Sequence, residues 1–280
     1  MKKRIIALLT AFICIGNAGA QSVNNAPVKL RVATYNVGHF NQGMKGGLEV
    51  RGKNYYPDNK AVTGNYIKQE LLAWRKWIGE QSLDLFCVQE WNRYFDQDST
   101  FIAENELLKP YYNNIYFGDQ HPWIYNGIAT NYRLTNLHQK YWFQDYYALI
   151  GDLQIGNKII KIISTHIPWK KEGHKPALDS IIAELKKYDH FICFGDTNSS
   201  DEELLQFSNA GFNIANGGYQ GWFMTTPGNV SLAGMKDGPN RHIDEIITSK
   251  NIKIMKVSAP YTRLNDMDHL PLIADVIITP

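Results

Sequence analysis

Cysteine is scarce in this chain, which has three among 280 residues. Cys14 lies in an apolar stretch near the N-terminus, whereas Cys87 and Cys193 lie inside apolar runs typical of buried strands. So few cysteines exclude a disulfide-rich scaffold, and we expect the two internal residues to be buried free thiols. A disulfide between them would require the two strands to face each other at bonding distance, which the sequence leaves open.

Apolar runs long enough to cross a membrane are also missing. The stretch from Ile5 to Ile15 is too short, because a membrane-spanning helix needs about 20 apolar residues. It follows three basic residues and precedes Ala18-Gly19-Ala20, the order of a secretory signal peptide. A lipoprotein anchor at Cys14 is disfavoured, because Ile13 stands where a small residue is usual. We expect a signal peptide at 1–20 cleaved near Ala20, a linker at 21–29 and one domain at 30–280, exported to the periplasm or secreted without a transmembrane anchor.

A large excess of positive charge is absent. The 29 basic residues include Lys2, Lys3 and Arg4 of the leader, so cleavage leaves 26 against 27 acidic residues, a formal charge of −1. A protein that neutralises many phosphates usually carries a positive excess. The balance therefore favours a small or local phosphate ester among anionic substrates.

Zinc-ligand spacing is absent as well, because no Cys/His pattern of a zinc site links the histidines. Five of them are predicted to be solvated or structural: His121, His138, His174, His190 and His242. Lys170, Lys171 and Lys175 lie near His174, so these residues form either a basic wall beside His166 or a solvated face.

Two apolar runs that end in polar residues are the most informative features present. Phe191–Phe194 is typical of a buried strand, and we expect a sharp backbone turn at Gly195, where the polar residues Asp196, Thr197 and Asn198 begin. Leu83–Val88 likewise delivers Gln89 and Glu90 at its end. A polar cap of this kind is often only a turn, but sheet enzymes also place catalytic groups at strand ends.

Four further segments carry residues able to bind a metal or a phosphate: Ala33–Asn36, Ile162–His166, His242–Asp244 and Met267–His269. In this order and spacing the chain resembles the endonuclease/exonuclease/phosphatase superfamily (DNase I-like) over roughly Leu30 to Ile278. Helical periodicity over Gly64–Gln81 and Lys175–Lys187, and a capping box at Ser200 with a helix end near Gly211, add three helices. Together they predict an α/β fold, a four-layer sandwich of two mixed β-sheets flanked by helices.

The resemblance implies a role for each strand-end residue. Glu90, Asp268 and Asn36 would hold a metal ion, Mg²⁺ or alternatively Mn²⁺, which prefers oxygen ligands. Asp196 would orient or deprotonate the attacking water, and Asn198 would donate hydrogen bonds to the phosphoryl oxygens. Asp244 would fix the ring of His269, and His166 would contact the phosphate. The expected catalytic residues are Asn36, His166, Asp196, Asn198, Asp244 and His269.

The sequence departs from the family at several positions that can reshape the site. Gly127–Arg133 replaces a Ser-Arg-Tyr-Pro motif, Met267 stands where serine is usual, and Glu245 stands where tyrosine is common. The loop Asn41–Thr63 contains Lys45, Arg51, Lys53 and Lys60, which either meet a phosphate backbone or are merely solvated. Tyr219, Trp222, Phe223 and Met224 suit base stacking, a lipid interface or core packing, of which packing is favoured.

These observations predict a monomeric, exported, metal-dependent phosphodiesterase, with a nuclease as the first choice. A phospholipid or phosphoinositide phosphohydrolase, including sphingomyelinase-like activity, is the alternative, so the partner is a phosphodiester of nucleic acid or of a phospholipid headgroup. An exported binding module that has lost catalysis is disfavoured, because all the strand-end residues remain.

Overall fold

The computed structural model of the chain describes residues 26–41, 64–95, 100–226, 241–264 and 268–279. The predicted signal peptide, and residues 42–63 of the predicted loop, lie outside these ranges. Among the described residues, no helix is long and apolar enough to span a membrane.

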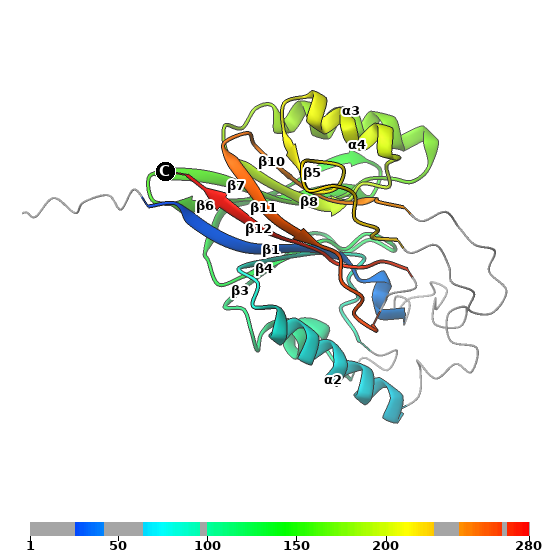
Figure 1. Cartoon of the computed structure of the whole chain (residues 1–280). Helices are drawn as coiled ribbons and strands as arrows, with labels where there is room; N and C mark the ends of the chain where they lie inside the picture. The colour runs from blue at the N-terminus through cyan, green and yellow to red at the C-terminus, as the bar shows by residue number, and fades with distance from the viewer. Residues whose placement is uncertain (1–25, 42–63, 96–99, 227–240, 265–267, 280) are drawn as a thin grey trace, which may run out of the picture.

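Two six-stranded mixed sheets form the centre of the molecule (Figure 1). In the first sheet β1 and β2 are parallel neighbours, and the other pairs are antiparallel. Its order is β11 (Ile252–Ser258), β12 (Leu272–Ile278), β1 (Val28–Asn36), β2 (Leu85–Gln89), β4 (Gly127–Thr130) and β3 (Asn114–Phe117).

The second sheet repeats this plan, with one parallel pair, β7 and β8, among antiparallel neighbours. Its order is β5 (Leu134–Phe143), β6 (Tyr146–Ile155), β7 (Lys158–His166), β8 (Phe191–Asp196), β10 (Asp244–Thr248) and β9 (Asn213–Ile214). Each parallel pair is joined by a crossover that contains a helix, as parallel strands require.

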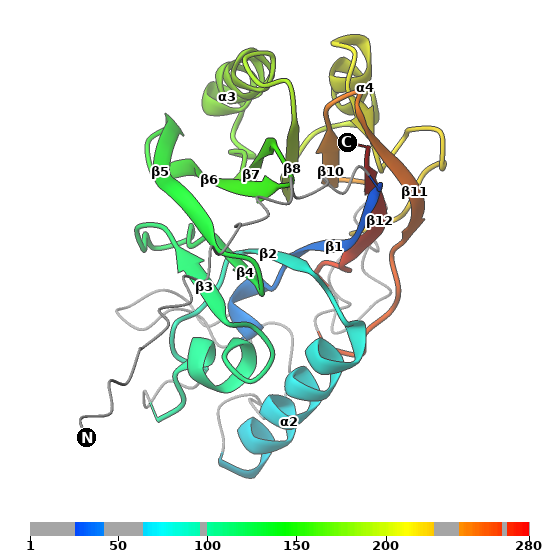
Figure 2. The ribbon, with the colours of Figure 1, turned by 90° about the vertical axis from the view of Figure 1, so that its left-hand side faces the viewer.

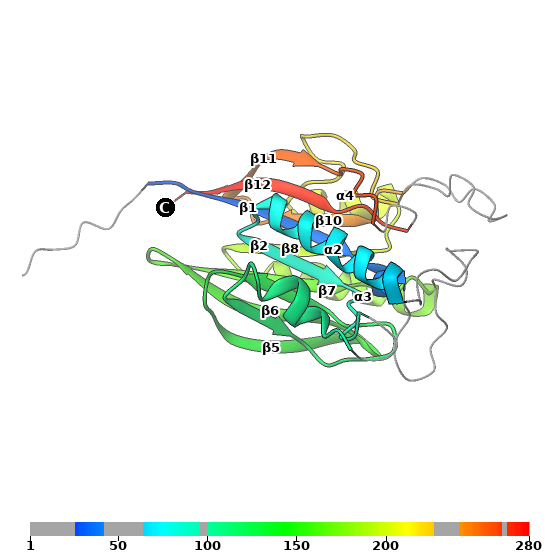
Figure 3. The ribbon, with the colours of Figure 1, turned by 90° about the horizontal axis from the view of Figure 1, so that it is seen from below.

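Helices cover the outer faces of both sheets (Figure 2). The helix α2 (Gly64–Gln81) runs over β1 and β2, with the short π-helix η3 (Glu104–Leu108) beside it (Figure 3). The second sheet is covered by α3 (Lys171–Leu185) and α4 (Asp201–Asn209). The four-layer α/β sandwich predicted from the sequence is therefore confirmed.

Apolar side chains form three buried layers that match this architecture. The layer between the sheets contains Leu30 and Val32 on β1 and Phe194 on β8. The neighbouring residues Ala33 and Tyr35 point the other way, into the layer under α2. The first half of β1 alternates apolar with basic residues, whereas every residue from Val32 to Asn36 is buried, because this half of the strand is covered on both faces.

The predicted helices and thiols agree with the structure. The bounds of α2 are those predicted, and Ser200 caps α4 through a reciprocal capping box with Glu203. The helix α3 begins at Lys171, four residues earlier than its apolar periodicity indicates, and has Pro176 inside it. Cys87 and Cys193 are both buried and free.

One edge of the molecule collects the ends of strands from both sheets. The carboxyl ends of β1, β2, β7 and β8 meet there, and the antiparallel strands β10 and β12 begin there. Asp244 therefore opens β10 instead of ending a strand, and His269 precedes β12. The prediction that these two segments end strands was therefore wrong, because an antiparallel strand begins where its neighbour ends.

Candidate active site

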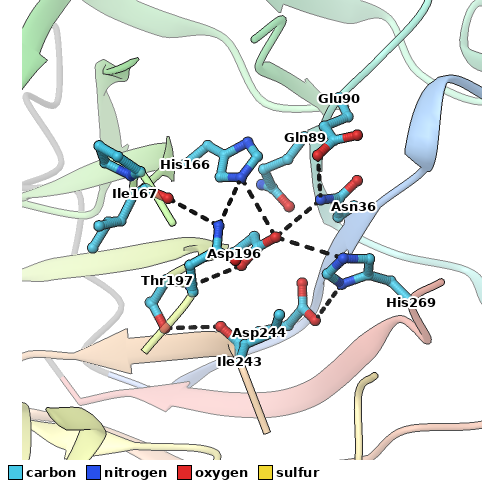
Figure 4. Close-up of polar contacts among 12 residues, drawn as sticks. Asn36, Gln89, Glu90, His166, Ile167, Asp196, Thr197, Ile243, Asp244 and His269 are labelled. Carbon is cyan, nitrogen blue, oxygen red and sulfur yellow. Dashed lines mark hydrogen bonds and ion pairs between the residues drawn. The ribbon is translucent and has the colours of Figure 1, made fainter. Parts of the chain in front are cut away.

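The carboxylate of Asp196 lies at the centre of the edge where the two sheets meet (Figure 4). Its Oδ2 lies 3.0 Å from Nδ2 of Asn36, which comes from the other sheet. The ring nitrogens Nε2 of His166 and His269 lie 3.5 Å and 3.6 Å from the same oxygen. Asp196 is 1% exposed, so its carboxylate is stabilised by the Asn36 amide and by His269 and not by bulk water.

Glu90 and Asn36 form the first-sheet side of the site. Nδ2 of Asn36 also donates to Oε1 of Glu90 at 3.2 Å, and its Oδ1 accepts from the backbone N–H of Gly38 at 3.0 Å. The adjacent Gln89 bridges the sheets, because it accepts from Thr34 at 2.9 Å and donates to Ser164 at 3.3 Å. These contacts hold the ends of β1, β2 and β7 in fixed relation.

Asn198 and His166 form the second-sheet side of the site. The Asn198 amide donates to Nε2 of His166 at 3.1 Å and to the carbonyl of Ile167 at 3.0 Å. Its backbone N–H donates to Oδ1 of Asp196 at 2.8 Å. Nδ1 of His166 is buried and has no hydrogen-bond partner among the described residues, which leaves it able to bond a ligand oxygen.

Glu90 and Asn198 have a left-handed backbone. Glu90 has a φ of 47° and Asn198 a φ of 49°. Asparagine tolerates this conformation, whereas glutamate adopts it rarely and at a cost of about 1–3 kcal/mol. Such strain is often found at functional sites, where it directs a side chain that the regular strand would point elsewhere.

His269 and Asp244 are bonded directly, with Nδ1 of the ring 2.8 Å from Oδ2 of the carboxylate. Burial disfavours the charged ring, but the Asp244 carboxylate, helped by Asp196 and Asp268, raises the pKa of His269 to about 10. The backbone N–H of Asp244 donates to Thr225 at 3.1 Å. The pairing expected from the resemblance is thus present in the geometry.

Two groups of side chains are able to hold a metal ion by their atom types. Asp196, Asp244 and His269 each offer one ligand atom, and these atoms lie within 4.8 Å of one another. Glu90, Asn36 and the half-buried Asp268 offer the oxygen donors that Mg²⁺ prefers. The second set fits a hard cation such as Mg²⁺ better, because all of its ligand atoms would be oxygens, whereas the first set includes an imidazole nitrogen.

Two further residues at the site were not predicted from the sequence. Nε2 of His39 lies 3.4 Å from Oε2 of Glu90, and the His39 ring contacts Trp123. Tyr146 packs its ring edgewise on His166, and burial together with Glu90 and Asp196 raises the pKa of its phenol to about 12. His39 could have been identified from the sequence, because it lies three residues after Asn36. No motif near Tyr146 indicates that it belongs to the site.

Several sequence interpretations change once the geometry is known. Gly195 lies within β8 and makes no sharp turn; glycine is needed because a Cβ there would lie 2.2 Å from the carbonyl oxygen of Thr165. Glu245 faces away from Asp244, and its Oε1 accepts backbone N–H groups of residues 215, 216 and 246 at 2.8, 2.8 and 2.9 Å. Glu245 therefore anchors the segment after β9 instead of shaping the site.

The aromatic cluster after Gly218 divides into two environments. Phe223 packs against the core between the sheets, as the packing interpretation expects. Tyr219 is fully exposed, and Trp222 is 42% exposed and lies against the ring of His242. The prediction of core packing is therefore confirmed for Phe223 and is wrong for the exposed rings of Tyr219 and Trp222.

Comparison with protein-family models and with curated protein sequences finds no match. Solved structures do match over nearly the whole chain. An endonuclease/exonuclease/phosphatase from Bacteroides vulgatus superposes with a TM-score of 0.63 and 16% identity, covering 89% of this chain and 98% of that one. A family protein from Bacteroides thetaiotaomicron gives a TM-score of 0.62, 13% identity and 90% and 99% coverage.

The TDP2 proteins have the same architecture. D. rerio TDP2, complexed with single strand DNA product, gives a TM-score of 0.62 at 11% identity and covers 89% of this chain and 98% of its own. Identities this low establish the fold and leave substrate open. The resemblance suggested by the strand-end motifs is confirmed at that level: this chain has the DNase I-like fold of the endonuclease/exonuclease/phosphatase superfamily.

Proposed function

We propose that this chain is an exported, divalent-metal-dependent phosphodiesterase that cleaves nucleic acid by in-line attack of water. The observation that carries the proposal is the environment of Asp196. A single buried carboxylate oxygen lies within 3.6 Å of Asn36, His166 and His269, at the junction of the two sheets. A fold shared with phosphoesterases supports the reaction class.

In this proposal Asp196 orients the attacking water and accepts its proton. Its position suits this role, because the Asn198 backbone N–H on Oδ1 and the Asn36 amide on Oδ2 fix the orientation of the carboxylate. His269, kept protonated by Asp244, stabilises negative charge on the phosphoryl group. His166 and the Asn198 amide donate hydrogen bonds to the remaining phosphoryl oxygens. To do so, the Asn198 amide gives up one of its two present acceptors, which are Nε2 of His166 and the carbonyl of Ile167.

Glu90, Asn36 and Asp268 would hold the metal ion. When bound, Mg²⁺ or Mn²⁺ polarises the phosphate and stabilises the leaving oxygen. Two observations support this assignment. Carboxylate oxygens are ligands that Mg²⁺ prefers, and Glu90 adopts a left-handed backbone of the kind often found at functional sites. The Asp196, Asp244 and His269 group is assigned to proton transfer instead, because its members are bonded to one another.

A phospholipid or phosphoinositide phosphohydrolase is the second candidate. The mature formal charge of −1 favours it, since 26 basic residues stand against 27 acidic ones outside the leader. Nucleic acid keeps the preference because Trp169, an exposed ring on which a base can stack, lines the same cavity as Asn198 of the site.

A side-by-side assay of plasmid DNA, RNA, sphingomyelin and inositol phosphates separates these candidates. The purified 21–280 chain should cleave nucleic acid in Mg²⁺, and turnover of lipid alone would establish the second candidate instead. An exported binding module becomes the answer if wild-type and Asp268→Ala protein are equally inert on every substrate yet bind a common ligand. N-terminal sequencing and the solution mass of the exported protein test cleavage near Ala20 and the monomeric state.

A further inference from the structure

A cavity of about 620 Å³ opens beside Asn198, between the first turns of α3 and α4. Its volume lies within the range of about 300–1,000 Å³ that is typical of small-molecule sites. The cavity is not formed by Glu90, Asp196 or His269, so it is a separate space that adjoins the candidate active site through Asn198.

Positive charge faces this cavity. Lys171 and Arg241 line it, and no carboxylate lies within 4.0 Å of either side chain among the described residues. The two carboxylates at the cavity have other partners. Asp201 bonds His242 at 3.0 Å, and Glu203 accepts from the backbone N–H of Ser200 at 2.8 Å. The lining still has one more positive than negative formal charge, because Lys171, Lys175 and Arg241 stand against Asp201 and Glu203, and this balance favours an anion.

A large aromatic ring lies at the same cavity. Trp169 is 67% exposed, although tryptophan is usually well covered in folded proteins. The ammonium group of Lys170 lies 5.8 Å from the centre of the Trp169 ring, which places a further positive charge next to the indole. An exposed indole beside cations suits a ligand that has both a flat ring and a negative charge.

The backbone of α3 adds to this preference. Its N-cap, Lys170, provides no side-chain acceptor to the first turn, so the positive end of the helix dipole is not capped by an oxygen of that residue. Lys171 and His174 of the first turn line the cavity. Nδ1 of His174 lies 2.8 Å from the carbonyl oxygen of Pro168, and this hydrogen bond fixes the ring at the cavity.

We propose that this cavity binds the nucleotide next to the scissile phosphate, with the base on Trp169 and the phosphate near Lys171 and Arg241. This inference rests on the proposed nuclease function and specifies its substrate as a strand of at least two nucleotides. It also explains how a chain with a mature formal charge of −1 binds an anionic polymer, because positive charge is placed where one phosphate is held.

The test compares Trp169→Ala, Lys171→Ala and Arg241→Ala with the wild-type 21–280 chain. Binding of a labelled single-stranded DNA octamer in EDTA should weaken about tenfold for Trp169→Ala, as expected for loss of one base stack, and Trp169→Phe should restore most of it. Lys171→Ala should lower the slope of log affinity against log salt by about 0.7. Lys253→Ala, an exposed lysine on β11, is the matched control and should change neither quantity.

Catalysis gives the second readout. In Mg²⁺, the ratio of kcat/KM for the octamer to that for bis(p-nitrophenyl) phosphate should fall about tenfold in the cavity variants. Wild-type octamer cleavage with unchanged binding and ratio in all three variants would overturn the subsite while leaving the nuclease function intact. If the wild-type protein cleaves no diester, the proposed function fails, and the metal-free binding data still decide the subsite. Loss of sphingomyelin turnover in place of DNA turnover would assign the cavity to a lipid headgroup.

Discussion

Nδ1 of His269 lies 2.8 Å from Oδ2 of Asp244, and both side chains are buried. Burial disfavours the charged ring, yet the carboxylate raises the pKa of His269 to about 10. Because the unfolded value is about 6.5, the pair contributes stability that is complete below about pH 6.5 and is lost as the pH rises through the folded value. His269 is therefore charged at neutral pH.

Asp244→Asn should remove this support and lower the pKa of His269. Turnover should fall by about 10²–10⁴, the usual range for the loss of a positioned proton-transfer group, while the fold is retained. NMR titration of the metal-free protein measures the pKa, and the exposed His138 serves as internal reference. If both the pKa and turnover stay unchanged, Asp244 is only a carboxylate at a strand start.

Glu90→Gln and Asp196→Asn should separate metal binding from chemistry. Glu90→Gln removes a charged oxygen donor, so Mg²⁺ affinity measured by calorimetry should fall by at least tenfold. Asp196→Asn should keep most of that affinity and lose turnover by about 10²–10⁴. The surface variant Glu106→Gln controls for the loss of one charge. Equal metal affinity in Glu90→Gln and the wild type would move the ion to the Asp196, Asp244 and His269 group.

Gly195→Ala tests how closely β7 and β8 must approach behind the site. The new Cβ would lie 2.2 Å from the backbone oxygen of Thr165, which cannot move without shifting β7. We expect the free energy of unfolding, measured in urea, to be about 1–3 kcal/mol lower for Gly195→Ala than for the wild type. Gly151→Ala on β6 is the control, because its Cβ would meet only side chains, the nearest at 3.0 Å, and should cost less. If the two variants were equally stable, the account in which β7 and β8 must approach closely at Gly195 would be contradicted.

The sequence predicts the elements whose signals are local. The periodicity of Gly64–Gln81 and the capping box at Ser200 predict α2 and α4, since both depend on neighbours within one or two turns. Asp196, Glu90 and Asn36 were identifiable because each follows an apolar strand. Tyr146 and the structural role of Glu245 were not, because their partners lie on other strands and depend on sheet pairing.

Glu184 on α3 gives a prediction about acid stability. Burial opposes its charge, but hydrogen bonds from Lys140, Lys187 and Tyr188 lower its pKa to about 2. A carboxylate with a lowered pKa contributes stability above its unfolded value of about 4.3, and this contribution is lost as the pH falls toward 2. Glu184→Gln should therefore destabilise the protein at pH 7 by about 1–2 kcal/mol.

Urea unfolding at pH 7 and pH 3 measures this effect, and the difference between Glu184→Gln and the wild type should shrink at the lower pH. Asp179→Asn on the same helix is the control, because its pair with Lys175 is exposed and should contribute little at either pH. A difference that is the same at both pH values would show that the charge of Glu184 is not responsible.

The most direct test of the central claim is phosphodiester hydrolysis by the 21–280 chain before and after metal removal. Single-stranded DNA should be cleaved in Mg²⁺, cleavage should stop in excess EDTA, and added Mg²⁺ should restore it. Asp196→Asn should remain inactive under all three conditions, with wild-type folding by circular dichroism. Hydrolysis that continues undiminished in EDTA, or that survives in Asp196→Asn, would contradict a metal-dependent phosphodiesterase centred on Asp196.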